Sequence, residues 1–279
     1  MSIKPTFSAY PFFILFITIS LSLHGQIPDS LGAFTRPSGA YFLSYFRDTY
    51  SFMTLPLRWN DRDWAAMATG LTTGAMVMGQ DDIWFDGLQK AKSPFTEDMS
   101  RYFLEPLGSG MITVPALALL YGYGAWKDSD KARQTSLMGI KAFVLAAGFS
   151  GGAKMMFHRS RPTEHNDPWH FGGPGFGTHH LSLPSGHTTA VFSVATIVAY
   201  QYREKPWIGI TAYTLATLAG LSRIHDGKHW PSDVFFGAML GYTLGRCIVS
   251  AENTQIRRIA IHPLLSPGCS GFSLAWNLK

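Results

Sequence analysis

The stretch from residue 184 to residue 200 reads PSGHTTAVFSVATIVAY, and it decides the fold class. The opening Pro-Ser-Gly-His is typical of a helix start, where Pro, Ser and Gly are favoured. The run that follows is apolar and does not alternate with a period of two, so it predicts a helix rather than a strand. One helix therefore begins at a polar tetrapeptide that contains a serine and a histidine.

Four more apolar segments with few charges lie on either side of this helix, over residues 111–126, 137–157, 207–221 and 234–249. No segment alternates long enough to predict a sheet. We therefore predict an all-α fold, a bundle of about five to six core helices with its active site at one end. A short strand over residues 271–278 is the one exception that we expect.

The composition favours a membrane-integral protein. Hydrophobic residues make up 46% of the chain and charged residues only 15%, against roughly 25% charged residues in ordinary soluble domains. Several apolar segments are shorter than the roughly 20 residues that a spanning helix prefers, so a soluble bundle stays open as the alternative. The net charge of +5 is modest, and no basic stripe is interleaved with aromatic residues, which argues against a nucleic-acid partner.

The N-terminus predicts export. Lys4 precedes an apolar run over residues 12–23, which has the length of a signal-peptide core or a short anchor. We divide the chain into a signal peptide or N-terminal anchor (1–25), an amphipathic or interfacial region (26–109), a catalytic helical bundle (110–250) and a tail (251–279). Residues 26–62 are polar and turn-rich, and we expect a surface segment there.

Short basic clusters separate the apolar segments, and they predict an orientation. If the segments span a membrane, these clusters fall on one face: Lys127, Lys131 and Arg133, then Arg203 and Lys205, then Arg257 and Arg258. Lysine and arginine in short loops mark the cytoplasmic side. The opposite face, which carries the motifs described next, is then expected to face the periplasm of a bacterial inner membrane.

Three separated motifs hold the residues whose side chains can take part in a reaction. They are Lys154 with Arg161-Pro162, then Pro184 to His187, and then Ser222-Arg223 with His229 and Asp233. The first lies at the end of a predicted helix, the second at a helix start, and the third connects the end of one helix to the start of the next. Because alternate helix ends of an up-down bundle share one face, we expect the three motifs to meet.

These residue types suit the binding of a phosphoryl group. Lys154, Arg161 and Arg223 can neutralise phosphate oxygens, the arginines through paired N–H donors. Ser185 and Gly186 stand at a helix start, where backbone N–H groups favour an anion. All five residues are therefore candidate phosphate ligands.

Two histidines divide the reaction between them. His229 can attack phosphorus as a nucleophile, and Asp233, one helical turn later, can hold the other ring nitrogen. His187 is then the general acid for the leaving oxygen. Since phosphoryl transfer depends mostly on positioning and charge stabilisation, this set is sufficient without a metal ion or another cofactor.

The three motifs resemble the signature of the type-2 phosphatidic acid phosphatase superfamily, K-x6-RP, PSGH and SR-x5-H-x3-D. All eleven fixed residues of that signature are present between residues 154 and 233. The superfamily includes membrane-associated bacterial lipid phosphatases, bacterial acid phosphatases and vanadium haloperoxidases. The resemblance implies an all-helical core, a phosphohistidine intermediate and hydrolysis without a metal. Residues 26–109 contribute nothing to it.

Several other polar and aromatic residues have a plainer interpretation. We interpret Arg159, His225 and Lys228 as solvated loop residues inside the motif spacers. The linker histidines have no defined ligand spacing for zinc, and neither have the two cysteines; these residues are His158, His165, His170, His179, His180, Cys247 and Cys269. Trp169, Phe171 and Phe176, among glycines, suggest a lid or a lip that contacts acyl chains.

The sequence thus predicts a hydrolase for phosphate monoesters or pyrophosphates, with a phosphorylated lipid as the favoured substrate and the membrane as its setting. A soluble periplasmic acid phosphatase with small-ester substrates is the first alternative. A vanadium-dependent haloperoxidase is a second, because vanadate mimics the phosphoryl transition state. A membrane scaffold or transporter with a relic site is the non-enzymatic reading, which the intact set of cations and histidines argues against.

Overall fold

The computed structural model describes residues 34–177, 179–255, 260–266 and 269–275. The predicted signal peptide or anchor over residues 1–25 lies outside the described residues, and so do Arg257 and Arg258. The core of the catalytic region is built of helices, with a long non-helical linker between Phe157 and Gly186, which confirms the predicted all-α bundle.

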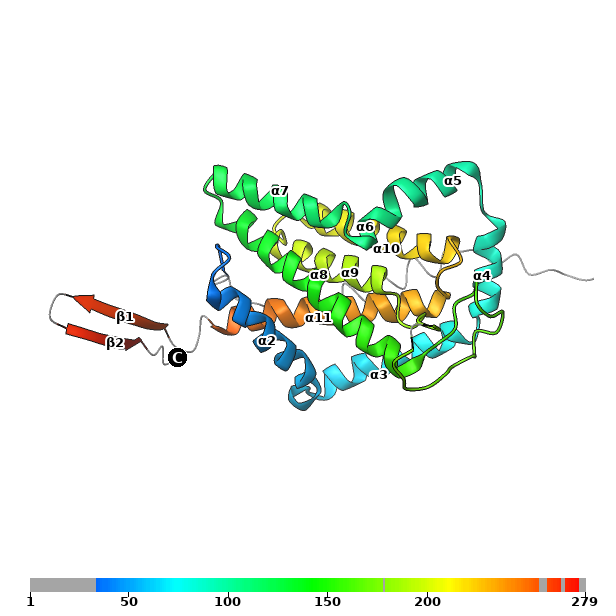
Figure 1. Cartoon of the computed structure of the whole chain (residues 1–279), viewed down its shortest axis with the longest axis horizontal. Helices are drawn as coiled ribbons and strands as arrows, with labels where there is room; N and C mark the ends of the chain where they lie inside the picture. Colours follow the sequence, from blue (N-terminus) through cyan, green and yellow to red (C-terminus); the bar gives the residue numbers. More distant parts are fainter. Residues whose placement is uncertain (1–33, 178, 256–259, 267–268, 276–279) are drawn as a thin grey trace, which may run out of the picture. The chain divides into compact units, whose positions relative to one another are not determined.

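Four long helices form the centre of the bundle (Figure 1). They are α8 (Asp130–Phe157), α9 (Gly186–Gln201), α10 (Pro206–His225) and α11 (Pro231–Gln255), and α9 packs against the other three. Almost every side chain of α9 from Thr188 to Ile197 is buried. The apolar stretch that predicted a helix is therefore the central helix of the fold.

A glycine stripe lets α11 approach α9 closely. A Cβ atom at Gly241 would lie 2.3 Å from the carbonyl oxygen of Thr189, and one at Gly237 would lie 2.7 Å from the carbonyl oxygen of Ser185. Gly245 continues the stripe one turn later, 2.7 Å from the Thr196 side chain. Backbones can meet this closely only where no side chain separates them. The stripe brings the start of α11 next to the start of α9.

The segments before the centre form shorter helices. Their bounds are α2 (Gly39–Met53), a 3₁₀ turn η1 (Leu55–Arg58), α3 (Asp61–Met78), α4 (Asp81–Lys90), α5 (Pro94–Met99), a π-helical turn η2 (Ser100–Leu104), α6 (Glu105–Ser109) and α7 (Thr113–Trp126). α7 matches the predicted apolar segment and packs on α8. α4 contacts both α10 and α11, and Figure 1 shows it across one end of the bundle.

Helix α2 stands where the sequence predicted a turn-rich surface segment. Ser38 caps it by accepting a hydrogen bond from the Tyr41 N–H. A buried ion cluster then holds it to the core: Lys141 Nζ of α8 lies 2.7 Å from Asp48 Oδ2 and 2.5 Å from Glu252 Oε1 of α11. These charges lie in three distant segments of the chain. The local sequence therefore does not predict that they pair, and the helix was missed.

Two helices among the described residues are long and apolar enough to cross a membrane, α8 and the Pro231–Glu252 part of α11. The pair Pro94–Ser109 and Thr113–Trp126, bent by 62°, makes a third if it crosses as one broken span. Large apolar side chains are exposed on the outer helices, among them Phe46 on α2 and Leu119 on α7. Exposed apolar area on this scale suits contact with lipid, and the protein is a membrane protein.

The tail contains a hairpin. Strand β1 (Ala260–Ser266) pairs antiparallel with β2 (Cys269–Ala275), with Ala260 opposite Ala275. Residues 271–275 of the predicted strand lie in β2, and the rest of it lies outside the described residues. The sequence analysis did not predict β1.

Candidate active site

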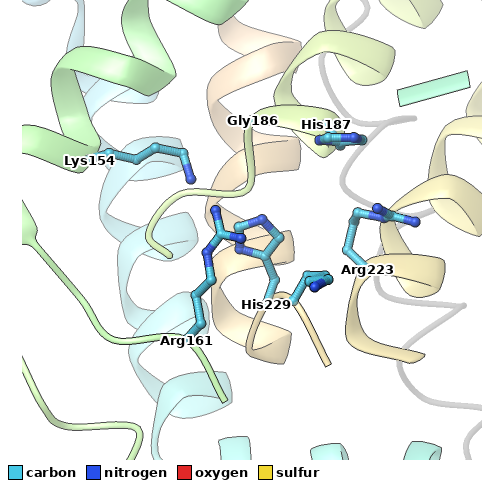
Figure 2. Close-up of a pocket in the computed structure, with 7 residues that line it drawn as sticks. Lys154, Arg161, Gly186, His187, Arg223 and His229 are labelled. Atoms are coloured by element: carbon cyan, nitrogen blue, oxygen red, sulfur yellow. The ribbon is translucent and has the colours of Figure 1, made fainter. Parts of the chain in front are cut away.

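The three motifs stand at helix ends on one side of the bundle. α8 ends three residues after Lys154, α9 begins at Gly186, α10 ends at His225, and α11 begins at Pro231. Between these ends lies a cavity of about 310 Å³. Its lining residues are Lys154, Arg161, Gly186, His187, Arg223, Lys228 and His229 (Figure 2). The structure thus brings six of the eight sequence-predicted site residues to one cavity, and Ser185 and Asp233 are buried in contact with these residues.

The cavity is strongly cationic. Lysine and arginine supply four of its lining side chains, and none of the lining residues in the described part of the chain is a carboxylate. The Lys154 Nζ donates to the carbonyl oxygens of Leu181 at 2.5 Å and Ser182 at 3.4 Å. Figure 2 shows the ends of Lys154 and Arg161 converging beside His229. Such a cavity complements a phosphoryl group in charge.

His229 is buried, and a carboxylate lies beside one of its ring nitrogens. Its Nδ1 lies 3.3 Å from Ser182 Oγ and 3.6 Å from Asp233 Oδ2. Burial lowers the pKa of His229 to about 4, and the positive charge of Lys154 adds to this effect, while Asp233 opposes it. The imidazole is therefore neutral at pH 7. Since Nδ1 is turned to Asp233, Nε2 is the nitrogen available to a bound phosphoryl group.

Asp233 is held by donors on both of its oxygens. Oδ2 accepts from Ser182 Oγ at 2.5 Å and from the Trp230 N–H at 2.9 Å, and Oδ1 accepts from Arg159 Nη1 at 2.7 Å. These contacts fix the carboxylate against rotation. Ser182 therefore joins the site, although no motif in the sequence pointed to it.

Arg159 was expected in a solvated loop, and that prediction is wrong. Its side chain is fully buried, and Nη2 forms an ion pair with Asp81 Oδ2 of α4 at 2.6 Å. Its Nε donates to the carbonyl oxygen of Pro168 at 2.8 Å. Asp81 in turn accepts from the N–H of Ser232 at 2.8 Å. Because the partners lie in α4 and α11, the spacing inside the first motif could not reveal them.

His187 faces a carboxylate that the sequence analysis also missed. Its Nε2 lies 3.3 Å from Glu105 Oε1, and Arg223 Nη1 lies 4.0 Å from the same oxygen. Asp226 pairs with Arg223 Nη2 at 2.5 Å. Burial and the Arg223 charge lower the pKa of His187, and Glu105 opposes them. Neither Asp81 nor Glu105 lies in a recognisable motif.

Ser185 is buried at the start of α9, directly before Gly186, and its role as a phosphate ligand stays a prediction. Its Oγ accepts from Thr188 Oγ1 at 2.9 Å and caps α9, and its N–H donates to the carbonyl oxygen of Asp233 at 2.9 Å. The N–H is therefore used inside the protein, whereas the hydroxyl only accepts in these contacts and keeps its own proton for another acceptor. Gly186 does line the cavity at the N-terminus of α9, where the helix dipole favours an anion.

The linker between α8 and α9 contains both buried and exposed side chains. His158 is buried, with Nε2 3.2 Å from the Gly177 carbonyl oxygen, and the rings of His165 and His170 stack with centroids 4.5 Å apart. Trp169 and Phe176 are exposed. Of the other two spacer residues, Lys228 lines the cavity, and His225 is half-buried with Nε2 3.0 Å from Thr96 Oγ1.

Comparisons with known proteins agree with this geometry. Over 138 residues, 47% of the chain, it is 34% identical to the lipid A 1-phosphatase of Porphyromonas gingivalis, of which it covers 27%. Over 152 residues, 54% of the chain, it is 28% identical to the undecaprenyl-diphosphatase of Sulfolobus acidocaldarius, of which it covers 69%. The chain therefore spans only about a quarter of the length of the first of these relatives.

One solved structure that is similar is that of LpxE from Aquifex aeolicus, with 26% identity and a TM-score of 0.45 over 60% of this chain and 93% of that one. Residues 137–257 match the family model of the PAP2 superfamily, and this range contains every residue of the three motifs. In its motifs and its helical bundle, this part of the chain is similar to the PAP2 superfamily.

Proposed function

We propose that this protein is a metal-independent phosphatase that removes a phosphate group from a lipid monoester or diphosphate through a phosphohistidine at His229. The observation that carries the proposal is the cavity itself, which is lined by four cationic side chains and two histidines. The named activities of the two relatives above, on lipid A and on undecaprenyl diphosphate, support the choice of a lipid.

The first half of the reaction forms a covalent intermediate. Lys154, Arg161 and Arg223 bind the non-bridging oxygens, so negative charge on the phosphoryl group is compensated throughout. The lone pair of His229 Nε2 attacks phosphorus, and the bond from phosphorus to the leaving oxygen breaks. His187 gives its proton to that oxygen. Asp233 stabilises the positive charge that develops on the His229 ring.

The second half releases phosphate. Water takes the place of the departed alcohol, His187 accepts a proton from it, and its oxygen attacks phosphorus. The P–N bond breaks and its electron pair returns to Nε2 of His229. Inorganic phosphate leaves with both histidines in their starting protonation states.

The exposed apolar surface supports a substrate drawn from the membrane. Met156 and Phe157 are exposed at the end of α8, and Trp169 and Phe176 are exposed on the linker that follows. All four lie within the chain segment that connects Lys154 to the start of α9. We infer that these side chains contact acyl or isoprenyl chains while the phosphate enters the cationic cavity.

The enzyme is proposed to act at the periplasmic face of a bacterial inner membrane. Lys131 and Arg133 lie at the start of α8, and Arg203 and Lys205 lie between α9 and α10, all at helix ends remote from the motifs. Basic short loops favour the cytoplasmic side. A reporter fused after Tyr202 should therefore behave as cytoplasmic, and one inserted near Gly175 as periplasmic. The reverse pattern would place the site on the cytoplasmic face, and two periplasmic readings would favour the soluble alternative.

The activity is tested with purified protein in detergent and release of inorganic phosphate as the readout. A lipid monophosphate, a lipid diphosphate and a soluble ester are compared, with His229→Ala as the inactive variant and His179→Ala, on the exposed linker, as its matched control. We expect release from at least one lipid with EDTA present. Release from the soluble ester alone would favour the acid-phosphatase alternative, and peroxide-dependent bromination with vanadate would favour the haloperoxidase.

A further inference from the structure

The two site histidines each face one carboxylate, but only one of those carboxylates belongs to a motif. His229 has Asp233 one turn away on α11. His187 has Glu105, which lies 82 positions earlier in the chain, on α6, with Oε1 3.3 Å from Nε2. Glu105 is not among the lining residues of the cavity.

The backbone around Glu105 is built to hold it there. α6 meets the ring of His187 closely, because a Cβ atom at Gly108 would lie 2.7 Å from the Cβ and 2.8 Å from the Cδ2 of His187. The π-helical turn η2 directly precedes Glu105, and such turns often occur at functional sites. Within it, the buried Ser100 donates from Oγ to Asp226 Oδ1 at 2.8 Å. Segment 100–108 is thus tied to α9 at one end and to α10 at the other.

The other charges around His187 are mainly positive. Arg223 of α10 and Lys154 of α8 both lower the pKa of His187, in addition to its burial, and Glu105 of α6 raises it. The segment that enters α11 contributes the neutral His229, whose partner Asp233 is already bound to Arg159. Glu105 is therefore the one carboxylate in direct contact with His187 among the described residues. Without it, only cations would remain to act on the ring.

We propose that Glu105 is the positioning residue that keeps His187 protonated and oriented as the general acid; this inference rests on the proposed function. The doubly protonated ring donates one N–H to Glu105 and the other to the leaving oxygen. As the P–O bond breaks, its electron pair goes to that oxygen, which takes the second proton from His187. The neutral ring that remains stays hydrogen-bonded to Glu105, ready to accept a proton from water in the second half of the reaction.

The test compares leaving groups in the Glu105→Gln variant. The leaving oxygen of an alkyl phosphate needs a proton. The leaving group of a nitroaryl phosphate with an alkyl chain is a nitrophenolate, which is a stable anion and needs none. We expect Glu105→Gln to lower kcat/KM for the alkyl phosphate by on the order of 10- to 100-fold and to leave the nitroaryl value within about threefold. The retained nitroaryl activity shows in the same sample that the variant is folded. Glu97→Gln, on the exposed part of α5, is the matched control.

Two further readouts separate this role from a structural one. Glu105→Asp should recover part of the alkyl activity, and Glu105→Gln should shift the basic limb of the alkyl pH profile to lower pH. Equal losses on both substrates, or none, would overturn the role of Glu105 while the phosphatase proposal stands. So would tighter vanadate inhibition with higher activity, because Glu105 would then compete with phosphate for Arg223. If wild type and Glu97→Gln hydrolyse neither substrate, the proposed function itself fails.

Discussion

Arg159 Nη1 donates to Asp233 Oδ1 at 2.7 Å, and neither side chain is exposed to solvent. The same guanidinium pairs with Asp81 at 2.6 Å, so one buried cation joins α4 to the start of α11. Through this contact α4 helps to hold the site, because Asp233 lies beside His229, the proposed nucleophile. Arg159, a residue inside a motif spacer, therefore helps to hold the Asp233 carboxylate in place.

Removing this cation should destabilise the fold. Arg159→Met leaves two buried carboxylates without their shared partner, and a broken buried ion pair costs about 3–5 kcal/mol. We expect a clear fall in Tm in detergent, whereas Arg62→Met, on the exposed start of α3, should change Tm little. Asp81→Asn should fall between the two, since Asp233 still balances the arginine. An unchanged Tm for Arg159→Met would show that Arg159 does not hold the two helices together.

The glycine stripe of α11 offers a second stability test. An alanine at Gly241 would place Cβ 2.3 Å from the Thr189 carbonyl oxygen, so α9 and α11 must separate. An alanine at Gly148 of α8 meets nothing within 4 Å, and there Gly→Ala should stabilise the helix by up to about 1 kcal/mol. We therefore expect opposite changes in Tm. Similar changes in both variants would contradict the close approach of the two helices.

The helical bundle and the face that holds the site could be predicted from the sequence, because the signals for them lie within short segments. Proline and serine at helix starts, apolar runs and the order of the motifs predicted α9, the bundle and the face that holds Lys154, His187 and His229. The supporting carboxylates were not predictable in the same way. Asp81 and Glu105 stand in short amphipathic helices, and only the folded chain brings them to Arg159 and His187.

Other differences have the same origin. The backbone N–H of Ser185 was expected to face an anion at the helix start, and in the structure it donates to the Asp233 carbonyl oxygen; phosphate binding by the Ser185 hydroxyl stays a prediction. Helix α2 was missed because its charged residues pair with distant helices, Asp48 with Lys141 of α8 and Arg47 with Glu252 of α11. In both places the structure depends on contacts between distant segments, and the residue pattern within one segment does not predict such contacts.

The pH dependence follows from the two histidines. The reaction needs a neutral His229, whose pKa is lowered to about 4, and a protonated His187, whose pKa is lowered from 6.5 by burial and Arg223. The first condition is met above about pH 4, and the second is met below a pKa that itself lies under 6.5. We expect a bell-shaped profile of kcat/KM with its maximum between these values. A maximum above pH 8 would contradict the assignment of acid and nucleophile.

Lys228 should select between monophosphates and diphosphates. It is exposed and lines the cavity next to His229, outside the set of three signature cations. The second phosphate of a diphosphate substrate would lie near the positive charge of Lys228. We therefore expect Lys228→Gln to lower kcat/KM for a lipid diphosphate by on the order of tenfold, which corresponds to the loss of one charge-assisted contact. The monophosphate value should change little, as should both values in Lys205→Gln. Equal losses on both substrates would assign Lys228 to general phosphate binding.

The covalent step is the central claim, and rapid quenching with a phosphate-labelled lipid substrate tests it most directly. Acid-labile label should appear on His229 within the first turnover, survive in the presence of EDTA, and be absent from His229→Ala. The His179→Ala control should carry the same label as the wild type. Label on another residue, or turnover that persists in His229→Ala, would contradict a phosphohistidine at this position.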